Sequence, residues 1–96
     1  METKFDIGQF VGVLTEQSVV SGIVERVKKK RRQMKLSQKE LSKKSGVTYA
    51  SIRRFETTGE ISLSSLLKIA HALNALKDFE GVFMGEVSTN LKDYKG

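Results

Sequence analysis

The stretch of residues 37–56 constrains the fold more than any other part of the chain. It contains two short helical patterns separated by a Ser-Gly pair, and the second pattern carries two adjacent arginines. Gly46 permits a backbone reversal with positive φ, which a β-carbon would oppose, so two helices can cross there at a steep angle. Thr48 can cap the second helix by accepting a hydrogen bond from a free N–H of its first turn. The sequence therefore predicts a tight pair of helices over 38–45 and 49–57.

Basic side chains are concentrated in the middle of the chain. Between Arg26 and Arg54 there are twelve Lys or Arg residues and one acid, Glu40, whereas the remaining residues carry five basic and ten acidic side chains. The middle therefore has a net charge of +11 and the rest a net charge of −5. Neutralisation of nucleic-acid phosphates requires a patch of this polarity. A run such as 28–32 can also be a plain solvent-facing helix surface, but its coincidence with the helix pair favours nucleic acid.

The composition argues against several other functions. A chain of 96 residues has room for one domain with one modest core. The absence of cysteine and the single histidine, His71, exclude disulfides and remove the usual ligands of structural zinc. His71 has no second histidine, cysteine or acid triad beside it, so we expect a surface histidine, no enzyme activity and no cofactor. No apolar run resembles a secretion signal or a membrane span, and we expect a cytoplasmic protein without a membrane partner.

Apolar residues follow helical spacing along nearly the whole chain, which predicts an all-α fold. Beside the central pair, the spacing predicts an N-terminal helix over 6–14, a longer helix over 18–33, a helix after Ser62 and a last short helix over 76–83. We expect an N-terminal arm or helix over 1–17, a five-helix domain over 18–85 and a polar tail over 86–96. The predicted inward positions include Leu14, Val20, Ile23, Val24, Val27, Met34, Leu41, Ile52, Phe55, Leu63, Leu66, Leu67, Ala70, Leu73, Phe79 and Phe83.

One arginine falls on an apolar stripe. Arg31 lies on the inner side of the predicted helix over 18–33, where an apolar residue is expected. A buried arginine needs an acidic partner, because an unpaired charge is costly to remove from water. Glu56 lies one helical turn after Ile52 on the inner side of its own helix. The sequence therefore predicts a structural ion pair between Arg31 and Glu56.

The segment from about Val24 to Leu76 resembles the lambda-repressor-like helix-turn-helix domains, the Cro/repressor or Xre family. The matching residues are Leu36-Ser37-Gln38, Glu40-Leu41, Gly46-Val47-Thr48, Ile52, Phe55-Glu56, Gly59, and Leu66, Ile69, Ala70 and Leu73. The resemblance implies a compact five-helix fold and double-stranded DNA as the partner. It also implies an arginine–glutamate pair at Arg31 and Glu56, in agreement with the helical-wheel argument.

The resemblance also implies roles for individual residues. Gln38 would bond a DNA phosphate, assisted by the positive end of its helix dipole; alternatively it is only an exposed N-terminal residue. Tyr49 and Ala50 would take the first base-facing positions, where Ala50 could meet a thymine methyl. Tyr49 could instead pack over the start of its helix. Arg54 points outward on the helical wheel and could bond guanine O6 and N7 through its guanidinium.

The remaining candidates would contribute phosphate contacts or charge. Arg53 would serve phosphate or solvent, and Thr48 and Ser51 are short enough to bond phosphate, although Thr48 could serve only as a cap. Lys28 and Lys35 would add positive charge, because the loop over 57–60 carries an acid and no base.

Two serines depart from the family pattern. Alanine is common in the family where Ser42 stands, and an apolar residue is common where Ser45 stands. We therefore expect a looser contact between the two helices of the motif.

These features predict a transcription regulator that binds a palindromic operator as a homodimer. Its half-sites would lie about one helical turn, roughly 34 Å, apart. The resemblance to the family implies repression where that operator overlaps a promoter. The alternative is an antitoxin-like protein whose DNA-binding core regulates its own operon while an arm binds a toxin-like partner. The apolar character of residues 5–14 motivates that alternative. A helix-turn-helix that has lost DNA binding and serves as a scaffold is the third possibility, against which Gln38, Arg54 and the basic charge argue.

Overall fold

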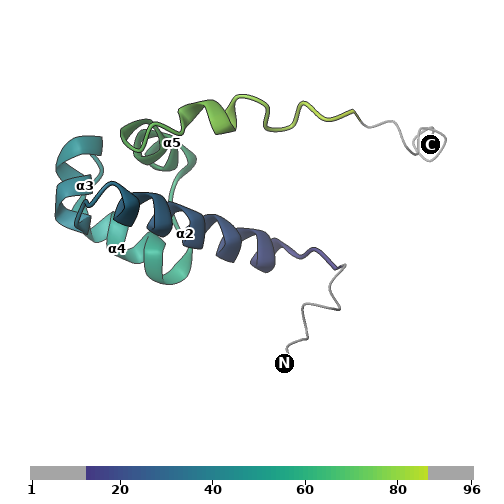
Figure 1. The fold of residues 1–96 in the computed structure, drawn as a ribbon. Coiled ribbons are helices and arrows are strands. Elements are labelled where there is room, and N and C mark those ends of the chain that lie inside the picture. The colour runs from purple at the N-terminus through teal and green to yellow at the C-terminus, as the bar shows by residue number, and fades with distance from the viewer. Residues whose placement is uncertain (1–12, 87–96) are drawn as a thin grey trace.

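The computed structural model describes residues 13–86, which fold into helices joined by short turns (Figure 1). The α-helices are α2 (Glu16–Gln33), α3 (Gln38–Ser45), α4 (Tyr49–Thr58) and α5 (Leu63–Ala72), and a 3-10 turn, η1 (Leu76–Phe79), follows α5. No strand occurs between residues 13 and 86, so the all-α prediction is confirmed for this part of the chain. The predicted helix over 6–14 lies almost wholly outside the described residues; Val13 and Leu14 are described, and they are exposed and not helical.

The starts of the helices follow from side-chain caps. Thr15 accepts a hydrogen bond from the Ser18 backbone N–H at 3.0 Å, and Ser18 Oγ accepts one from the Thr15 N–H, so α2 begins at Glu16, two residues before the predicted start. Ser37 and Glu40 form the same reciprocal pair at α3. Hydrogen bonds from the Ser37 backbone and hydroxyl hold the pKa of the Glu40 carboxyl below its ordinary value. These caps set α3 in place at the start of the motif.

Two glycines end α3 and α4 in the left-handed region. Gly46 has φ 82° and Gly59 has φ 85°, and each N–H bonds the carbonyl four residues earlier. A β-carbon at Gly46 would meet no atom within 4 Å, so this position needs glycine only for its backbone angle. A β-carbon at Gly59 would collide with Val20 of α2. Gly59 therefore also allows the end of α4 to approach α2 closely.

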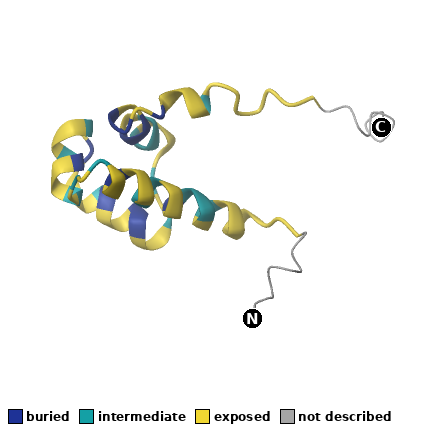
Figure 2. Cartoon of the chain, viewed as in Figure 1, coloured by how far each residue is buried: buried dark blue, intermediate teal, exposed yellow. Residues whose placement is uncertain are grey.

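The core lies where α3, α4 and α5 meet against α2 (Figure 2). Its most deeply buried side chains are Leu41, Ile52, Phe55 and Ile69. The inward positions predicted for the central helix pair are thus confirmed. Residues that surround this centre are Val24, Val47, Ala70, Ala72, Leu73 and Ala75, with Val27, Met34, Leu36 and Ile61 partly buried against it.

Three predicted inward positions are wrong: Leu14, Leu63 and Phe83. Leu14 precedes α2 and is 79% exposed. Leu63 is 68% exposed, because the first turn of α5 is not covered by another helix and Ile69 takes the central place instead. Phe83 is fully exposed. The helix predicted over 76–83 is only the 3-10 turn η1 followed by turns, and Phe83 itself has φ 68°. The helical spacing that would have stacked Phe83 on Phe79 is therefore lost, and the fifth α-helix is not confirmed in residues 13–86.

Candidate nucleic-acid interface

The turn between α3 and α4 is held by two serine hydroxyls. Ser42 Oγ donates to the Val47 carbonyl at 2.6 Å, and Ser45 Oγ accepts from the Val47 N–H at 3.1 Å. Both backbone polar groups of Val47 are thus satisfied while its side chain is buried in the core. The prediction that Ser42 and Ser45 loosen this contact misses these bonds, because the hydroxyls replace apolar packing with direct support of the turn.

The inner face of α4 is anchored by the predicted ion pair. Arg31 Nε lies 2.8 Å from Glu56 Oε2 and Arg31 Nη2 lies 2.9 Å from Glu56 Oε1, so the guanidinium bonds both carboxylate oxygens. Arg31 Nη1 also donates to the Leu36 carbonyl at 2.9 Å. The two charged side chains are only 10% and 4% exposed. The pair therefore joins α2 to α4 and to the turn before α3.

Gln38 has a contact that the sequence did not predict. Its Nε2 donates to Glu56 Oε1 at 2.8 Å, which adds α3 to the same network. Gln38 is half-buried, with one amide N–H used inside the domain. The wheel of a single helix does not reveal this bond, since the two residues are eighteen positions apart and on different helices.

This network controls the charge of Glu56. Burial alone would raise the pKa of the carboxyl, but hydrogen bonds from Arg31 and Gln38 and the positive charges of Arg31 and Lys28 hold the pKa below its ordinary value. Glu56 is therefore a carboxylate at neutral pH, as the paired geometry requires.

A basic and aromatic cluster lies at the start of α4. The Tyr49 ring is partly exposed and contacts two cations. Lys39 Nζ lies 5.3 Å from the centroid of the ring, and Arg53 Cζ lies 5.6 Å from it. Cations at these distances are attracted by the ring face. Tyr49 thus does not pack into the core; its ring contacts one cation from α3 and one from α4. Lys39 was not among the predicted site residues, because its link to Tyr49 crosses between helices.

The remaining candidates on α4 are at the surface. Ala50 is exposed and Ser51 is half-buried. Thr48 Oγ1 accepts from the Ser51 N–H at 3.1 Å and donates to Ser51 Oγ at 2.9 Å, so both sides of its hydroxyl serve the cap. Arg54 is exposed, and its Nη2 lies 3.5 Å from Glu60 Oε1. Glu60 is therefore a neighbour of Arg54, whereas the sequence identified it only as an acid in the loop after α4.

The two predicted lysines outside α4 lie elsewhere. Lys28 is half-buried on α2, with Nζ 3.5 Å from Glu25 Oε2, and its charge acts on Glu56. Lys35 is exposed in the turn after α2 with φ 59°. The structure thus brings Tyr49, Ala50, Arg53 and Arg54 together on the outer side of α4, whereas Lys28 supports its inner side.

A comparison with protein-family models matches residues 27–77 to the family described as helix-turn-helix. The match covers more than half of the chain and spans the Arg31–Glu56 anchor, the serine-held turn and α4. The chain belongs to the helix-turn-helix family. It is of the Cro/repressor, Xre-like type, as the sequence resemblance indicates. No curated protein and no solved structure matches the chain.

Helix-turn-helix domains of this family are DNA-binding and regulatory, and they are not typically enzymes. In this helix-turn-helix protein, α3 and α4 are the paired helices and the turn at Gly46 joins them. Among the helices between residues 13 and 86, none has the length and apolar character that crossing a membrane requires. The partner class that the family supports is double-stranded DNA.

Proposed function

We propose that the protein is a sequence-specific transcriptional regulator that places α4 in the major groove of operator DNA. The observation that carries the proposal is the division of α4 into two faces. Glu56, Ile52 and Phe55 fix its inner face, whereas Tyr49 and Arg54 are exposed on the outer face. A reading helix needs this combination, because base contacts require side chains held in a defined register.

The roles of the outer residues follow from their chemistry. Arg54 is the base-reading side chain, since its guanidinium can leave the weak, exposed pair with Glu60 and bond guanine O6 and N7. Ala50 offers a methyl group to thymine. Tyr49 carries two cations whose charges suit adjacent phosphates, so Lys39 and Arg53 belong to backbone binding.

The role proposed for Gln38 is narrower than the resemblance implies. One N–H of its side-chain amide is used by Glu56, which leaves the other N–H and the backbone of the first turn of α3 for a phosphate. Gln38 would therefore contact Glu56 of the buried ion pair and a DNA phosphate at the same time. Thr48 and Ser51 contribute chiefly by defining where α4 starts, while Lys28 and Lys35 add to the positive field.

We further propose that the regulator acts as a homodimer and represses by occupying a palindromic site that overlaps a promoter. Two copies of α4 would enter successive major grooves about 34 Å apart. The antitoxin-like alternative depends on residues 5–14, most of which lie outside the described part of the chain. No contact among residues 13–86 favours it.

In vitro selection from random duplex DNA tests the proposal. The wild type should enrich an inverted repeat with half-sites centred about 10 base pairs apart. Arg54→Ala should lose preference at one position per half-site, at a cost of about 1 to 3 kcal/mol for the preferred base. Arg32→Ala, which removes an exposed arginine of α2, is the matched control and should leave the motif unchanged. Failure to enrich any sequence, or an unchanged motif with Arg54→Ala, would refute the assignment.

A further inference from the structure

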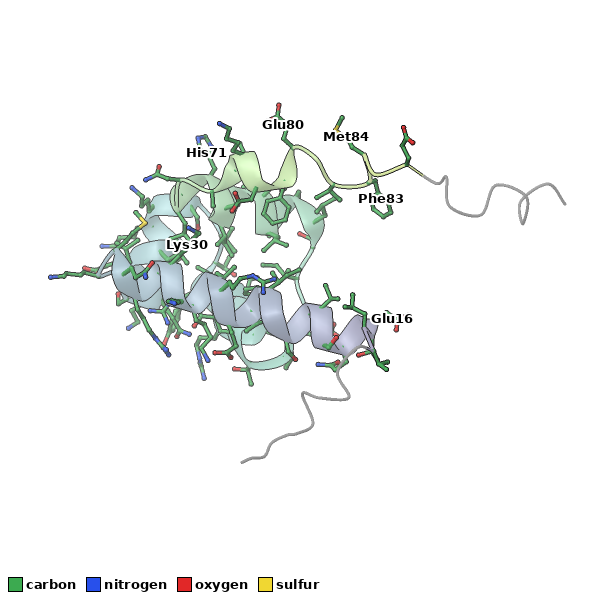
Figure 3. The ribbon with its side chains drawn as sticks, turned by 45° about the vertical axis from the view of Figure 1, so that its right-hand side comes forward. Glu16, Lys30, His71, Glu80, Phe83 and Met84 are labelled. Carbon is green, nitrogen blue, oxygen red and sulfur yellow. The ribbon has the colours of Figure 1, made fainter. Side chains whose placement is uncertain are left out.

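The end of the described chain exposes three consecutive apolar residues. Val82, Phe83 and Met84 are 53%, 100% and 74% exposed, and they follow η1 on an extension that leaves the helices (Figure 3). Figure 3 shows Phe83 and Met84 pointing to opposite sides of this extension. Phe83 also has φ 68°, a backbone angle that is unfavourable for an aromatic residue. A run of this kind on a soluble domain is a liability unless something covers it.

An apolar groove begins at the first of these three residues, Val82. It lies between α2, α5 and η1 and has a volume of about 280 Å³. A cavity of about 150 Å³ accepts a benzene molecule, so this groove has room for a phenyl ring. Its apolar lining consists chiefly of Ile23, Val27, Leu66, Leu73, Phe79 and Val82. The groove is on the side of α2 and α5, whereas the proposed reading residues are on α4.

The groove and the exposed run have complementary charges. Arg26 and Lys30 lie at the groove and are both exposed, although Asp78 also lines it. The exposed run is flanked by the acids Glu80 and Glu86. An approaching copy of this segment would therefore bring carboxylates toward guanidinium and ammonium groups.

The arrangement also satisfies the geometry of a two-fold interface. In such an interface each copy must present both the projecting side chain and the groove that receives it. Val82 lines the groove, and Phe83 is the next residue along the chain, so the two features lie side by side on one surface.

We propose that two copies of the chain dimerise through this surface, with Phe83 of each copy inserted into the groove of the other. The inference rests on the homodimer in the proposed function and identifies its interface. Burial of Val82, Phe83 and Met84 supplies the apolar part of the contact. Pairs between Glu80 or Glu86 and Arg26 or Lys30 align the two copies.

The test is sedimentation equilibrium of the full chain without DNA. At about 100 μM the wild type should be a dimer, as expected for a dissociation constant in the micromolar range. Phe83→Ser should raise the dissociation constant at least about tenfold, a loss of roughly 1.4 kcal/mol. Val13→Ser is the matched control, since Val13 is also apolar and 72% exposed but precedes α2 and does not line the groove, and it should dimerise like the wild type. Because Phe83 is fully exposed in the monomer, its replacement should leave the thermal midpoint unchanged at protein concentrations well below the dissociation constant of the dimer.

Charge reversal provides a second readout. Arg26→Glu with Lys30→Glu should weaken the dimer, and adding Glu80→Lys with Glu86→Lys should restore it. A monomeric wild type, a Phe83→Ser variant that dimerises as tightly as the wild type, or failure of the charge rescue would overturn the proposal. A dimer that is lost on deletion of residues 1–12 but persists in Phe83→Ser would also overturn the proposal. Each result concerns assembly alone, so selection of a half-site by a monomer would refute this interface and leave the DNA-reading assignment standing.

Discussion

Replacing Arg31 by methionine should destabilise the domain more than any surface substitution. The change keeps an unbranched side chain in the same space but removes the charge and three donors. Glu56 would lose two hydrogen bonds, at 2.8 and 2.9 Å, and would keep the bond from Gln38. The Leu36 carbonyl would lose its donor as well.

The expected loss follows from burial. Removing one partner of a buried ion pair costs about 3 to 5 kcal/mol, because the other charge remains without compensation. The two side chains here are 10% and 4% exposed, which places Arg31 and Glu56 in that class. A domain of this size has a total stability of about 5 to 15 kcal/mol, so Arg31→Met is expected to use a large part of it.

Urea unfolding followed by circular dichroism measures this loss. The midpoint should fall with little change in the m-value, which would show that stability and not compactness has changed. The double variant Arg31→Met with Glu56→Met should recover most of the loss, since no buried charge remains. Gln38 and the Leu36 carbonyl still lose their hydrogen-bond partners, which costs about 1 kcal/mol. A free energy of unfolding for Arg31→Met within about 1 kcal/mol of the wild type would refute the anchor as described.

Three other predictions follow from the same contacts. Gly46→Ala should lower the free energy of unfolding by about 1 kcal/mol, because alanine is unfavourable in the left-handed region. Gly59→Ala should lower it by at least about 2 kcal/mol, because the new β-carbon also meets Val20. In thermal unfolding, adding Val20→Ala to Gly59→Ala should relieve part of the difference between the two glycine variants. The pKa of Glu56 is lowered by folding, so the stability that it contributes is present above about pH 4.3 and is lost as the pH falls below that value. Glu56→Gln should flatten this acid dependence in urea titrations. Glu60→Gln should tighten DNA binding severalfold at low salt by freeing its arginine partner on α4, and fluorescence anisotropy with equal affinities for the two proteins would contradict this.

Local patterns in the sequence determined much of this fold. The caps at Ser37 and Thr48 and the glycine at position 46 act within a few residues, so the bounds of α3 and the start of α4 could be predicted. The Arg31–Glu56 pair could be predicted because a charge on an apolar stripe demands a partner. Each of these predictions uses only local residues or the helical wheel of a single helix.

Contacts between elements were harder to predict. The Lys39–Tyr49 contact, the Gln38–Glu56 bond and the Arg54–Glu60 pair depend on how separate elements meet, which helical spacing does not specify. The last helix was predicted from the spacing of Phe79 and Phe83. A left-handed residue at Phe83 breaks that spacing, and Gly81, between the two phenylalanines, already weakens the helical pattern there.

Affinity cleavage measures where α4 lies on DNA. The chain contains no cysteine, so a single Ala50→Cys substitution can carry an iron chelate that cleaves nearby DNA. On the selected duplex, we expect cuts centred in the major groove of each half-site, about one helical turn apart. His71→Cys, at an exposed position on α5, is the control and should give no such cuts. Cleavage that is absent from Ala50→Cys, or stronger from His71→Cys, would contradict the placement of α4 in the groove.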